Sequence, residues 1–521
     1  MDLVRYKCTS NADNLKESVS MKAKKVISKV LAAALASAML LSCVYAASPD
    51  RTMSSAAQSN GNFSASATTN GKKPKYVFLF IGDGMSYPQI QSTSDYLGAL
   101  KDEDYWQAQP SLDDNQGAIL DGPEYLNFMN FEAAGSAVTY DSNSFAPDSA
   151  STATSLSTGH KTYSGSINVD ETGTVEYETI AEKLHSQKGY SIGVITSVNL
   201  NHATPAAFYA HQASRSNYYD IGLEMVESDF DYFAGGGLLD PTGSEGDQTD
   251  LYQLAQEAGY TVAKTHAEAD AIGTNTEKAI IIDEDLADSD AMAYELDRTD
   301  DMWALADYVA KGIEVLDNDT GFFMMCEGGK IDWACHANDA ASSIHDTQAL
   351  ADAVQVAIDF AKEHADETLI LVTGDHETGG LTIGFAGTDY DTYLDLLENQ
   401  KISFAKYDSD YVASYKANKT PFETVLADIE KLFGLKAQGE EGDKLVLTAY
   451  EMEQLRAAYE KSVNGTAASQ YEQEEYVLYG TYEPLSVTIT HIINNKSGIS
   501  FTSYSHTGLP VAVFADGVNA E

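Results

Sequence analysis

The segment CEGGKIDWACH, residues 326–336, carries two carboxylates and one imidazole within a few positions of each other. Asp332 and His336 are four residues apart, a spacing that places both side chains on one face of a helix. A second group, Asp375 and His376, stands in the motif GDHETGG. Oxygen and imidazole donors together are typical of zinc sites, and two adjacent ions would need about this many ligands. The two segments therefore predict a metal centre.

A serine suited to nucleophilic chemistry lies in DSASTAT, residues 148–154. The small residues allow close backbone approach, and Ser149 would stand at a helix start, where free amides favour an anion. Taken alone, Asp148 or Ser149 is an ordinary helix N-cap. A serine alkoxide needs a metal or a base to form, so the neighbouring metal-type cluster favours a catalytic role for Ser149.

These residues need a scaffold that brings distant segments together. Short apolar runs bounded by glycine or polar residues are typical of buried parallel strands. Four such runs predict strands at 76–81, 191–195, 321–325 and 368–372. Helical spacing of apolar residues fills intervals between them, at 302–316 and 340–361. This alternation predicts a three-layer α/β sandwich with a mainly parallel central sheet flanked by helices.

Three carboxylates follow three of these runs. Asp83, Glu327 and Asp375 each come directly or shortly after a predicted strand. Ligands of such sheets bind beyond the carboxyl ends of the strands, so we expect the three carboxylates to share one rim.

Residues 387–485 differ in composition from the rest of the chain. They are rich in Tyr, Glu and Lys and carry helical patterns at 422–433 and 448–462, without a catalytic motif. We interpret them as a crown-like insertion that covers the site or forms an interface. The catalytic domain is then discontinuous, at 74–386 and 486–521.

Composition limits the partners. The chain has 521 residues, 43% of them hydrophobic, and a net charge of −47. So acidic a surface disfavours nucleic acid and anionic lipid as partners, and we expect no nucleic-acid binding.

The N-terminus predicts export. Residues 1–46 are interpreted as a signal peptide whose natural start is Met21, with basic residues before an apolar run that is too short to span a bilayer. The signal has two alternative endings. Cleavage after Ala46 would give a periplasmic or secreted protein, whereas the lipobox-like LLSC would give a cell-surface lipoprotein with Cys43 lipidated. Residues 47–73 are predicted to be a flexible linker.

Outside the N-terminal segment the chain has two cysteines, Cys326 and Cys335. They flank the carboxylates of the first segment, so thiolate ligation of a metal is one reading. The hard oxygen donors around them favour plain packing instead.

Six motifs in order resemble the bacterial alkaline phosphatase family, from about Lys75 to the C-terminus. They are DGM (83–85), PDSASTATSLSTGHKT (147–162), NHATPAAFYAHQASR (201–215), EGGKIDWACH (327–336), GDHETGG (374–380) and HTG (506–508). The resemblance implies metal-dependent hydrolysis of phosphate monoesters through a phosphoserine intermediate, by a protein that forms homodimers.

The resemblance also implies residue roles. Ser149 would be the nucleophile and Arg215 the phosphate clamp. The metal ligands would fall into three sites: Asp332, His336 and His506 for one zinc; Asp83, Asp375 and His376, with Ser149, for a second zinc; Asp83, Thr204 and Glu327 for a magnesium.

The chain departs from the family pattern in places. His202 and Trp333 occupy positions where some members carry Asp and Lys. His202 stands close to Thr204 in sequence, so one expectation is that it acts at the third metal site and shifts that site towards zinc or cobalt. The alternative is that His202 only forms a hydrogen bond to a group around that site. The chain ends fifteen residues after His506, sooner than the resemblance implies, which leaves open whether a final strand is absent.

Two other functions remain open from the sequence. A sulfatase or phosphodiesterase of the same superfamily is one, although the chain lacks the Cys/Ser-x-Pro-x-Arg motif of sulfatases. The other is a non-catalytic metal-binding or adhesive surface lipoprotein. The presence of Ser149 together with every metal ligand argues against that reading.

Overall fold

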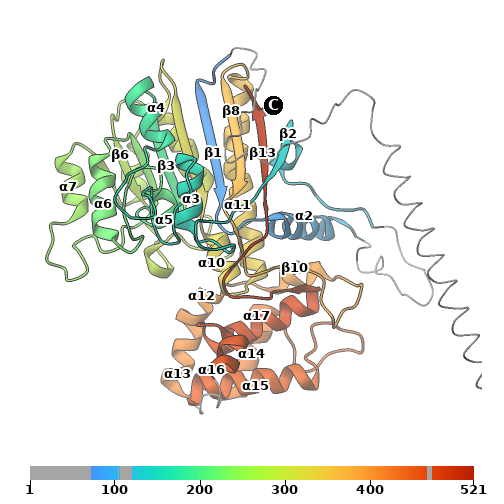
Figure 1. Ribbon diagram of the computed structural model, residues 1–521. Coiled ribbons are helices and arrows are strands. Elements are labelled where there is room, and N and C mark those ends of the chain that lie inside the picture. The colour runs from blue at the N-terminus through green and yellow to red at the C-terminus, as the bar shows by residue number, and fades with distance from the viewer. Residues whose placement is uncertain (1–71, 104, 106–119, 466–471, 521) are drawn as a thin grey trace, which may run out of the picture. The chain divides into compact units, whose positions relative to one another are not determined.

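A nine-stranded sheet lies at the centre of the computed structural model (Figure 1), which describes residues 72–520 apart from 104, 106–119 and 466–471. The strand order is β2-β13-β8-β1-β7-β3-β4-β6-β5. β13 runs antiparallel to its neighbours β2 and β8, and the other pairings are parallel. The strands are β1 (Tyr76–Gly82), β2 (Ala133–Ala137), β3 (Ser191–Asn199), β4 (Tyr232–Gly236), β5 (Thr261–Ala263), β6 (Ala279–Ile282), β7 (Phe322–Gly328), β8 (Thr368–Gly374) and β13 (Val511–Gly517).

Alternation along β1 explains the three layers. Phe78 and Phe80 point into the core on one side of the sheet, whereas Leu79 and Ile81 belong to the core on the other side. Because successive side chains of a strand point to opposite faces, a continuous apolar run requires cover on both. The first face is covered by α2 (Tyr87–Lys101), α9 (Leu305–Leu316) and α11 (Ala340–Glu363), and the second by α3 (Ser149–Thr158), α4 (Ile180–Lys188) and α5 (Ala203–Ala206).

The predicted sandwich and its mainly parallel sheet are confirmed. All four predicted strands are present as β1, β3, β7 and β8, and the predicted helix at 340–361 is α11. The helix predicted from 302 begins at Leu305 instead. The Asp307 side chain accepts a hydrogen bond from the Ala304 amide at 2.8 Å, which fixes the helix start.

The register of the central strands aligns the predicted carboxylates. Ile81 of β1 pairs with Glu327 of β7 and with Thr373 of β8, so the three strands end at the same level. Asp83 and Asp375 follow directly after β1 and β8. The three carboxylates therefore share one edge of the sheet, as predicted.

A group of helices at 394–497, which we call the helical cap, has a core of its own. Val425, Ile429, Leu455 and Ile489 are buried together in it. Beyond the carboxyl end of β1 (Figure 1), the cap contains η5 (Leu394–Asn399), α12 (Phe404–Tyr407), α13 (Ala413–Asn418), α14 (Phe422–Phe433), α15 (Ala449–Asn464), α16 (Glu472–Tyr479) and α17 (Pro484–Ser497). α17 packs against α15, although all but its first two residues lie beyond the predicted insertion boundary at 485. The boundaries at 387 and 485 stay predictions.

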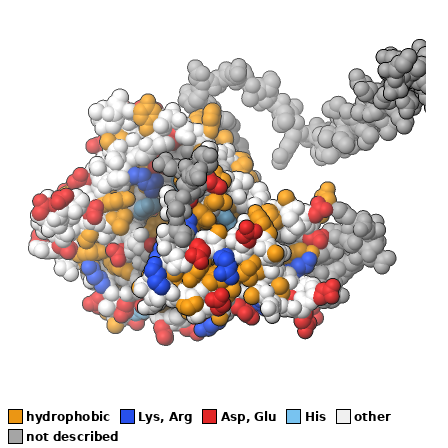
Figure 2. Space-filling view, turned by 90° about the horizontal axis from the view of Figure 1, so that it is seen from below, with side chains coloured by type: hydrophobic (Ala, Val, Ile, Leu, Met, Phe, Trp, Pro, Cys, Tyr) orange, Lys and Arg blue, Asp and Glu red, His pale blue; other side chains and the backbone are white. Residues whose placement is uncertain are grey.

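The predicted signal peptide and nearly all of the predicted linker lie outside the described residues. Within the part of the chain that the structure describes, no helix has the length and apolar character needed to cross a membrane. Acidic side chains are scattered among hydrophobic and basic ones over the face in Figure 2.

Candidate active site

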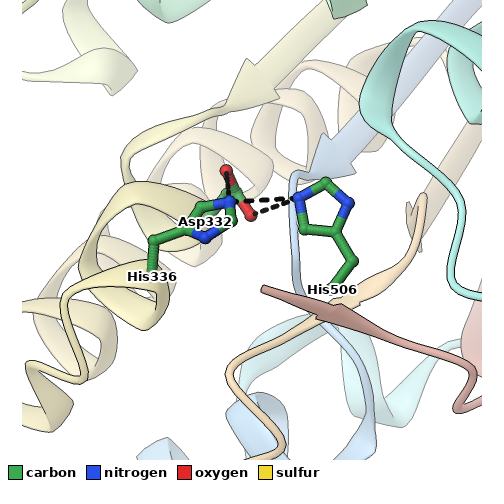
Figure 3. A group of neighbouring side chains, drawn as sticks. All are labelled: Asp332, His336 and His506. Atoms are coloured by element: carbon green, nitrogen blue, oxygen red, sulfur yellow. Dashed lines mark hydrogen bonds and ion pairs between the residues drawn. The ribbon is translucent and has the colours of Figure 1, made fainter. Parts of the chain in front are cut away.

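A first group of metal-type side chains consists of Asp332, His336 and His506 (Figure 3). α10 (Lys330–His336) presents Asp332 and His336 from successive turns, and His506 comes from β12 (His506–Thr507), which pairs with β9 (Glu377–Thr378). The His336 Nε2 lies 3.3 Å from Asp332 Oδ2, and the His506 Nε2 lies 3.5 Å from Asp332 Oδ1. The three predicted ligands of the first zinc site thus converge within 4.8 Å.

The hydrogen bonds of the two imidazoles favour a cation between them. The His336 Nδ1 lies 2.6 Å from the Tyr504 carbonyl oxygen, and the His506 Nδ1 lies 2.6 Å from the Pro147 carbonyl oxygen. A ring nitrogen that faces a carbonyl carries a proton, so in the neutral imidazole, the form that binds a metal, each Nε2 has a lone pair. Both lone pairs face Asp332, which is an arrangement that suits a metal ion.

A second group is fully enclosed and contains Asp83, Asp375 and His376. The His376 Nε2 lies 3.2 Å from Asp83 Oδ1 and 3.4 Å from Asp375 Oδ2. The Ser149 Oγ lies 3.2 Å from the same His376 nitrogen and 3.5 Å from Asp83 Oδ1. The structure therefore brings the predicted nucleophile to the predicted second zinc site.

The third predicted group offers oxygen alone. The Thr204 hydroxyl donates to Asp83 Oδ2 at 3.3 Å, and the Thr196 hydroxyl donates to one oxygen of Glu327. The other oxygen of Glu327 is buried and has no hydrogen-bond partner among the described residues. A buried carboxylate oxygen without a donor is costly, and an oxygen-only site suits a hard ion such as magnesium.

The charges at this rim need compensation. Burial, followed by the carboxylates of Asp375, Asp332 and Glu327, raises the pKa of Asp83 well above its ordinary value. Burial also raises the pKa of Glu327 and of Asp375. Several buried carboxylates this close together cannot all ionise unless cations neutralise them, so the residues fit bound metal ions.

Ser149 is the first residue of α3, as the sequence predicts. Asp148 caps this helix, because its Oδ1 accepts a hydrogen bond from the Ser151 amide at 3.2 Å. The free amides of the first turn favour a negative group at Ser149. The cap reading thus holds for Asp148, and the catalytic role of Ser149 at the start of α3 stays a prediction.

Arg215 and Ser149 line one cavity of about 660 Å³ that also reaches Asp332, His336 and His506. Its Nη1 donates to Asp148 Oδ2 at 2.9 Å, and its Nη2 lies 3.3 Å from His202 Nε2. Asp148 therefore orients the guanidinium as well as capping α3.

The two departures from the family pattern also line this cavity. The rings of His202 and Trp333 meet edge to face with their centroids 5.9 Å apart. Burial, and then the charge of Arg215, lowers the pKa of His202 to about 3, so its imidazole is neutral at ordinary pH. The place of His202 beside Arg215 leaves its predicted role at the third metal site a prediction.

Three threonines at the site were missed by the sequence reading. The Thr152 hydroxyl donates to Asp375 Oδ2 at 3.0 Å, and the Thr378 hydroxyl donates to Asp332. Thr196 contacts Glu327 as described above. Thr152 and Thr378 stand inside the motifs DSASTAT and GDHETGG, where a search for hydroxyls next to carboxylates would have found them.

Neither cysteine belongs to a group of metal-type side chains among the described residues. Cys326 is buried in the sheet core and unpaired. The Cys335 sulfur lies 3.2 Å from the Ser343 hydroxyl and is also unpaired.

Two carboxylate–imidazole groups beside a helix-terminal serine and an arginine define a metal-dependent hydrolase. The chain belongs to the alkaline phosphatase family, whose model, described as "Alkaline phosphatase", matches residues 74–521. It is 31% identical over 468 residues to "Alkaline phosphatase 3" of Bacillus subtilis (strain 168), covering 87% of this chain and 86% of that protein.

Solved structures agree with the fold. The cold-active alkaline phosphatase of the psychrophile Shewanella sp. superposes with a TM-score of 0.63 at 28% identity, over 85% of this chain and 94% of that one. A His-to-Glu mutant of the alkaline phosphatase from the Antarctic bacterium TAB5, described with Mg bound in its M3 site, has a TM-score of 0.54 at 25% identity, over 86% of this chain and 92% of that one. The predicted family, fold and enzyme class are confirmed, and hydrolysis of phosphate monoesters is the activity of the class.

Proposed function

We propose that this chain hydrolyses phosphate monoesters through a phosphoserine at Ser149. The observation that carries this proposal is the position of the Ser149 Oγ, 3.2 Å from His376 Nε2 and in the same cavity as Arg215. A nucleophile, a cationic clamp and two metal-type groups meet at one point, which is what in-line phosphoryl transfer requires.

The reaction consists of two displacements. In the first, the Ser149 oxygen bonds to phosphorus, the bond from phosphorus to the ester oxygen breaks, and the serine proton ends on the departing alcohol. In the second, a water oxygen bonds to phosphorus and the bond to Ser149 breaks. One water proton returns to the serine oxygen, and inorganic phosphate leaves.

Arg215 holds the phosphate during both steps. Its guanidinium can donate two parallel hydrogen bonds to phosphate oxygens, and the Asp148 contact keeps it turned towards Ser149. The amides at the start of α3 add partial positive charge at the same place. Only together with bound metal ions would these groups reverse the local sign of a protein whose net charge is −47.

The donor sets favour zinc in two sites and magnesium in the third. Asp332, His336 and His506 would hold one zinc, and Asp83, Asp375 and His376 the second. Asp83, Thr204 and Glu327 would hold the magnesium. When bound, such ions would supply positive charge to the phosphate and lower the pKa of the serine and of water. The TAB5 mutant, described with Mg bound in its M3 site, supports a third ion in this family.

Hydrolysis of p-nitrophenyl phosphate with and without a chelator tests the proposal. We expect activity that chelator abolishes and that zinc with magnesium restores. Bis(p-nitrophenyl) phosphate and p-nitrophenyl sulfate serve as the diester and sulfate arms, and both should be hydrolysed far more slowly. A metal-loaded protein that hydrolyses none of the three would contradict the proposal, as would preference for the diester or the sulfate.

We further propose that the protein is exported, with a mature N-terminus at Cys43 or Ala47. The predicted signal lies outside the described residues, and its composition is the support. Mass spectrometry of the native N-terminus separates the forms. A diacylglyceryl or triacyl mass on Cys43 identifies a lipoprotein, a free Ala47 a periplasmic or secreted protein, and an intact Met1 would refute export.

A homodimer remains part of the proposal. Val138 and Phe145 near edge strand β2 are 72% and 86% exposed. Val138 also lines an apolar groove of about 620 Å³, together with Leu156 and Ile180. Exposed apolar patches of this kind support a protein–protein interface. Light scattering of the metal-loaded protein measures the oligomeric state.

A further inference from the structure

The cavity that contains Ser149 has an outer half to which, apart from Trp333, segments outside the catalytic motifs contribute. Trp333 follows Asp332 on α10, and Asp288 comes from the loop after β6. Phe404, Asp408, Tyr482 and Glu483 come from the helical cap and its entry to α17. A phosphate group fills only a small part of about 660 Å³, so this outer half is the space in which the alcohol of a phosphate ester would lie.

The carboxylates of the outer half are poorly compensated. One oxygen of Asp408 and one of Glu483 are shielded from solvent and accept no hydrogen bond from the described residues. The second oxygen of Glu483 forms an ion pair with Lys416. Burial raises the pKa of Asp408 to about 7, which indicates a carboxylate with too few donors around it. Both residues line the cavity, so their negative charge favours a positively charged group within it.

Aromatic rings enclose the same space. Phe404 and Tyr482 meet edge to face with their centroids 5.7 Å apart, and the Trp333 ring lies at the boundary with the inner half, next to His202. Aromatic faces attract cations, most strongly ammonium groups that have left water. The aromatic walls are a second feature, independent of the carboxylates, that favours a cationic group over a neutral or anionic one.

The two halves therefore have opposite character. The inner half holds Arg215 and the metal ligands and suits a dianion, and the outer half holds carboxylates and aromatic rings. We propose that the outer half, through Asp288, Asp408, Glu483, Trp333, Phe404 and Tyr482, selects phosphate monoesters whose alcohol carries an ammonium group, such as aminoalkyl and trimethylammonioalkyl phosphates. This inference rests on the proposed phosphomonoesterase function and specifies its substrate class.

Three esters of similar size test the selection on the metal-loaded enzyme. Choline phosphate carries a trimethylammonium group, 3,3-dimethylbutyl phosphate is its neutral carbon isostere, and 2-carboxyethyl phosphate is anionic. We expect kcat/KM to fall in that order, with the cationic ester favoured over its isostere by about 10-fold, the size of one desolvated cation–aromatic or charged contact. Added salt should reduce this preference in the parent enzyme.

The two esters differ in the intrinsic reactivity of their leaving alcohols. This difference cancels when the ratio of their kcat/KM values is compared between a variant and the parent enzyme. Asp408→Asn and Glu483→Gln, made singly and together, should lower kcat/KM for choline phosphate about 10-fold more than for its neutral isostere. Asp410→Asn is the matched control, because Asp410 is an exposed carboxylate two residues away that pairs with Lys406. It should leave the ratio of the two esters as in the parent.

The outcomes separate this inference from the function it rests on. The enzyme could hydrolyse p-nitrophenyl phosphate while neither Asp408→Asn nor Glu483→Gln changes the ratio of kcat/KM for choline phosphate to that for its neutral isostere. That result would overturn the proposed substrate class but not the proposed function. A preference of the parent enzyme for the anionic ester would do the same. If the metal-loaded parent enzyme hydrolysed no phosphate monoester, the proposed function and this inference would both be wrong.

Discussion

The Nε2 atoms of His336 and His506 lie 3.1 Å apart, while both Nδ1 atoms face backbone carbonyl oxygens. Two neutral imidazoles in these tautomers have no proton to share between their Nε2 atoms. Asp332 approaches both, so one cation can satisfy the whole group. His506 is thereby joined to a segment 170 residues earlier in the chain.

Replacement of His506 should prevent a zinc ion from binding to this group of side chains. We expect His506→Ala to reduce bound zinc by about one ion per chain and to lower turnover by about 100-fold or more, because a ligand loss exceeds the 10–100-fold effect of losing an outer-shell partner. Metal analysis by mass spectrometry and a p-nitrophenyl phosphate assay measure both. His160→Ala, at an exposed histidine outside the cavity, is the control. Full zinc content in His506→Ala would show that the group is not a metal site.

Arg215 should affect phosphate binding more than metal content. Arg215→Ala removes a clamp and leaves the reacting groups in place, so turnover should fall about 10- to 1000-fold and inhibition by phosphate should weaken. Arg298→Ala provides the matched control, since Arg298 is similarly buried and pairs with Glu295 instead. An unchanged inhibition constant for phosphate would mean that Arg215 does not contact the substrate.

His202 and Trp333 should tune the third metal and product release. We expect His202→Asp to strengthen activation by magnesium, because a carboxylate helps hold the waters of that ion. Trp333→Lys adds a cation beside Asp332 and should lower the inhibition constant for phosphate. Magnesium titration, metal analysis and phosphate inhibition measure these effects. The expectation for His202→Asp would be contradicted if the third site of the parent enzyme were already fully occupied by magnesium and both enzymes showed the same magnesium dependence.

His211 should make stability depend on pH. Burial lowers the pKa of His211, but hydrogen bonds and charges from Glu182 and Glu224 outweigh this and raise it to about 10 from an ordinary 6.5. The folded state then holds the proton more tightly than the unfolded state. Its contribution is complete below about pH 6.5 and is lost as pH rises through about 10.

His211→Gln removes this titration. The free energy of unfolding of the parent should exceed that of the variant most at pH 6, and the difference should shrink towards pH 10 by on the order of 1–3 kcal/mol. Denaturant unfolding of the metal-loaded protein across this range provides the measurement. A difference that stays constant with pH would show that His211 carries no extra proton in the folded state.

The sheet and the rim of carboxylates could be predicted because both depend on local signals. Apolar runs ending in glycine and aspartate identify buried strands, and parallel strands place their carboxyl ends at one edge. The grouping of Asp332 with His506 needed the family resemblance, because β12 reaches the site only through its pairing with β9.

The outer half of the cavity could not be predicted. Asp408 and Glu483 stand in segments without any catalytic pattern, and only the packing of the helical cap places them opposite Trp333. The helical patterns at 422–433 and 448–462 also do not predict that α17 packs into the same hydrophobic core as these two helices. These features depend on tertiary contacts between distant segments.

The most direct test of the central claim is to trap the covalent intermediate. Metal-loaded enzyme is incubated with radiolabelled inorganic phosphate at low pH, where dephosphorylation is slow, then quenched in acid, digested and sequenced by mass spectrometry. Ser155→Ala, on the same helix, serves as the control beside Ser149→Ala. We expect one phosphoserine, at Ser149, that is absent from Ser149→Ala although its metals remain bound. A phosphorylated residue at any other position, or label that persists in Ser149→Ala, would contradict the account.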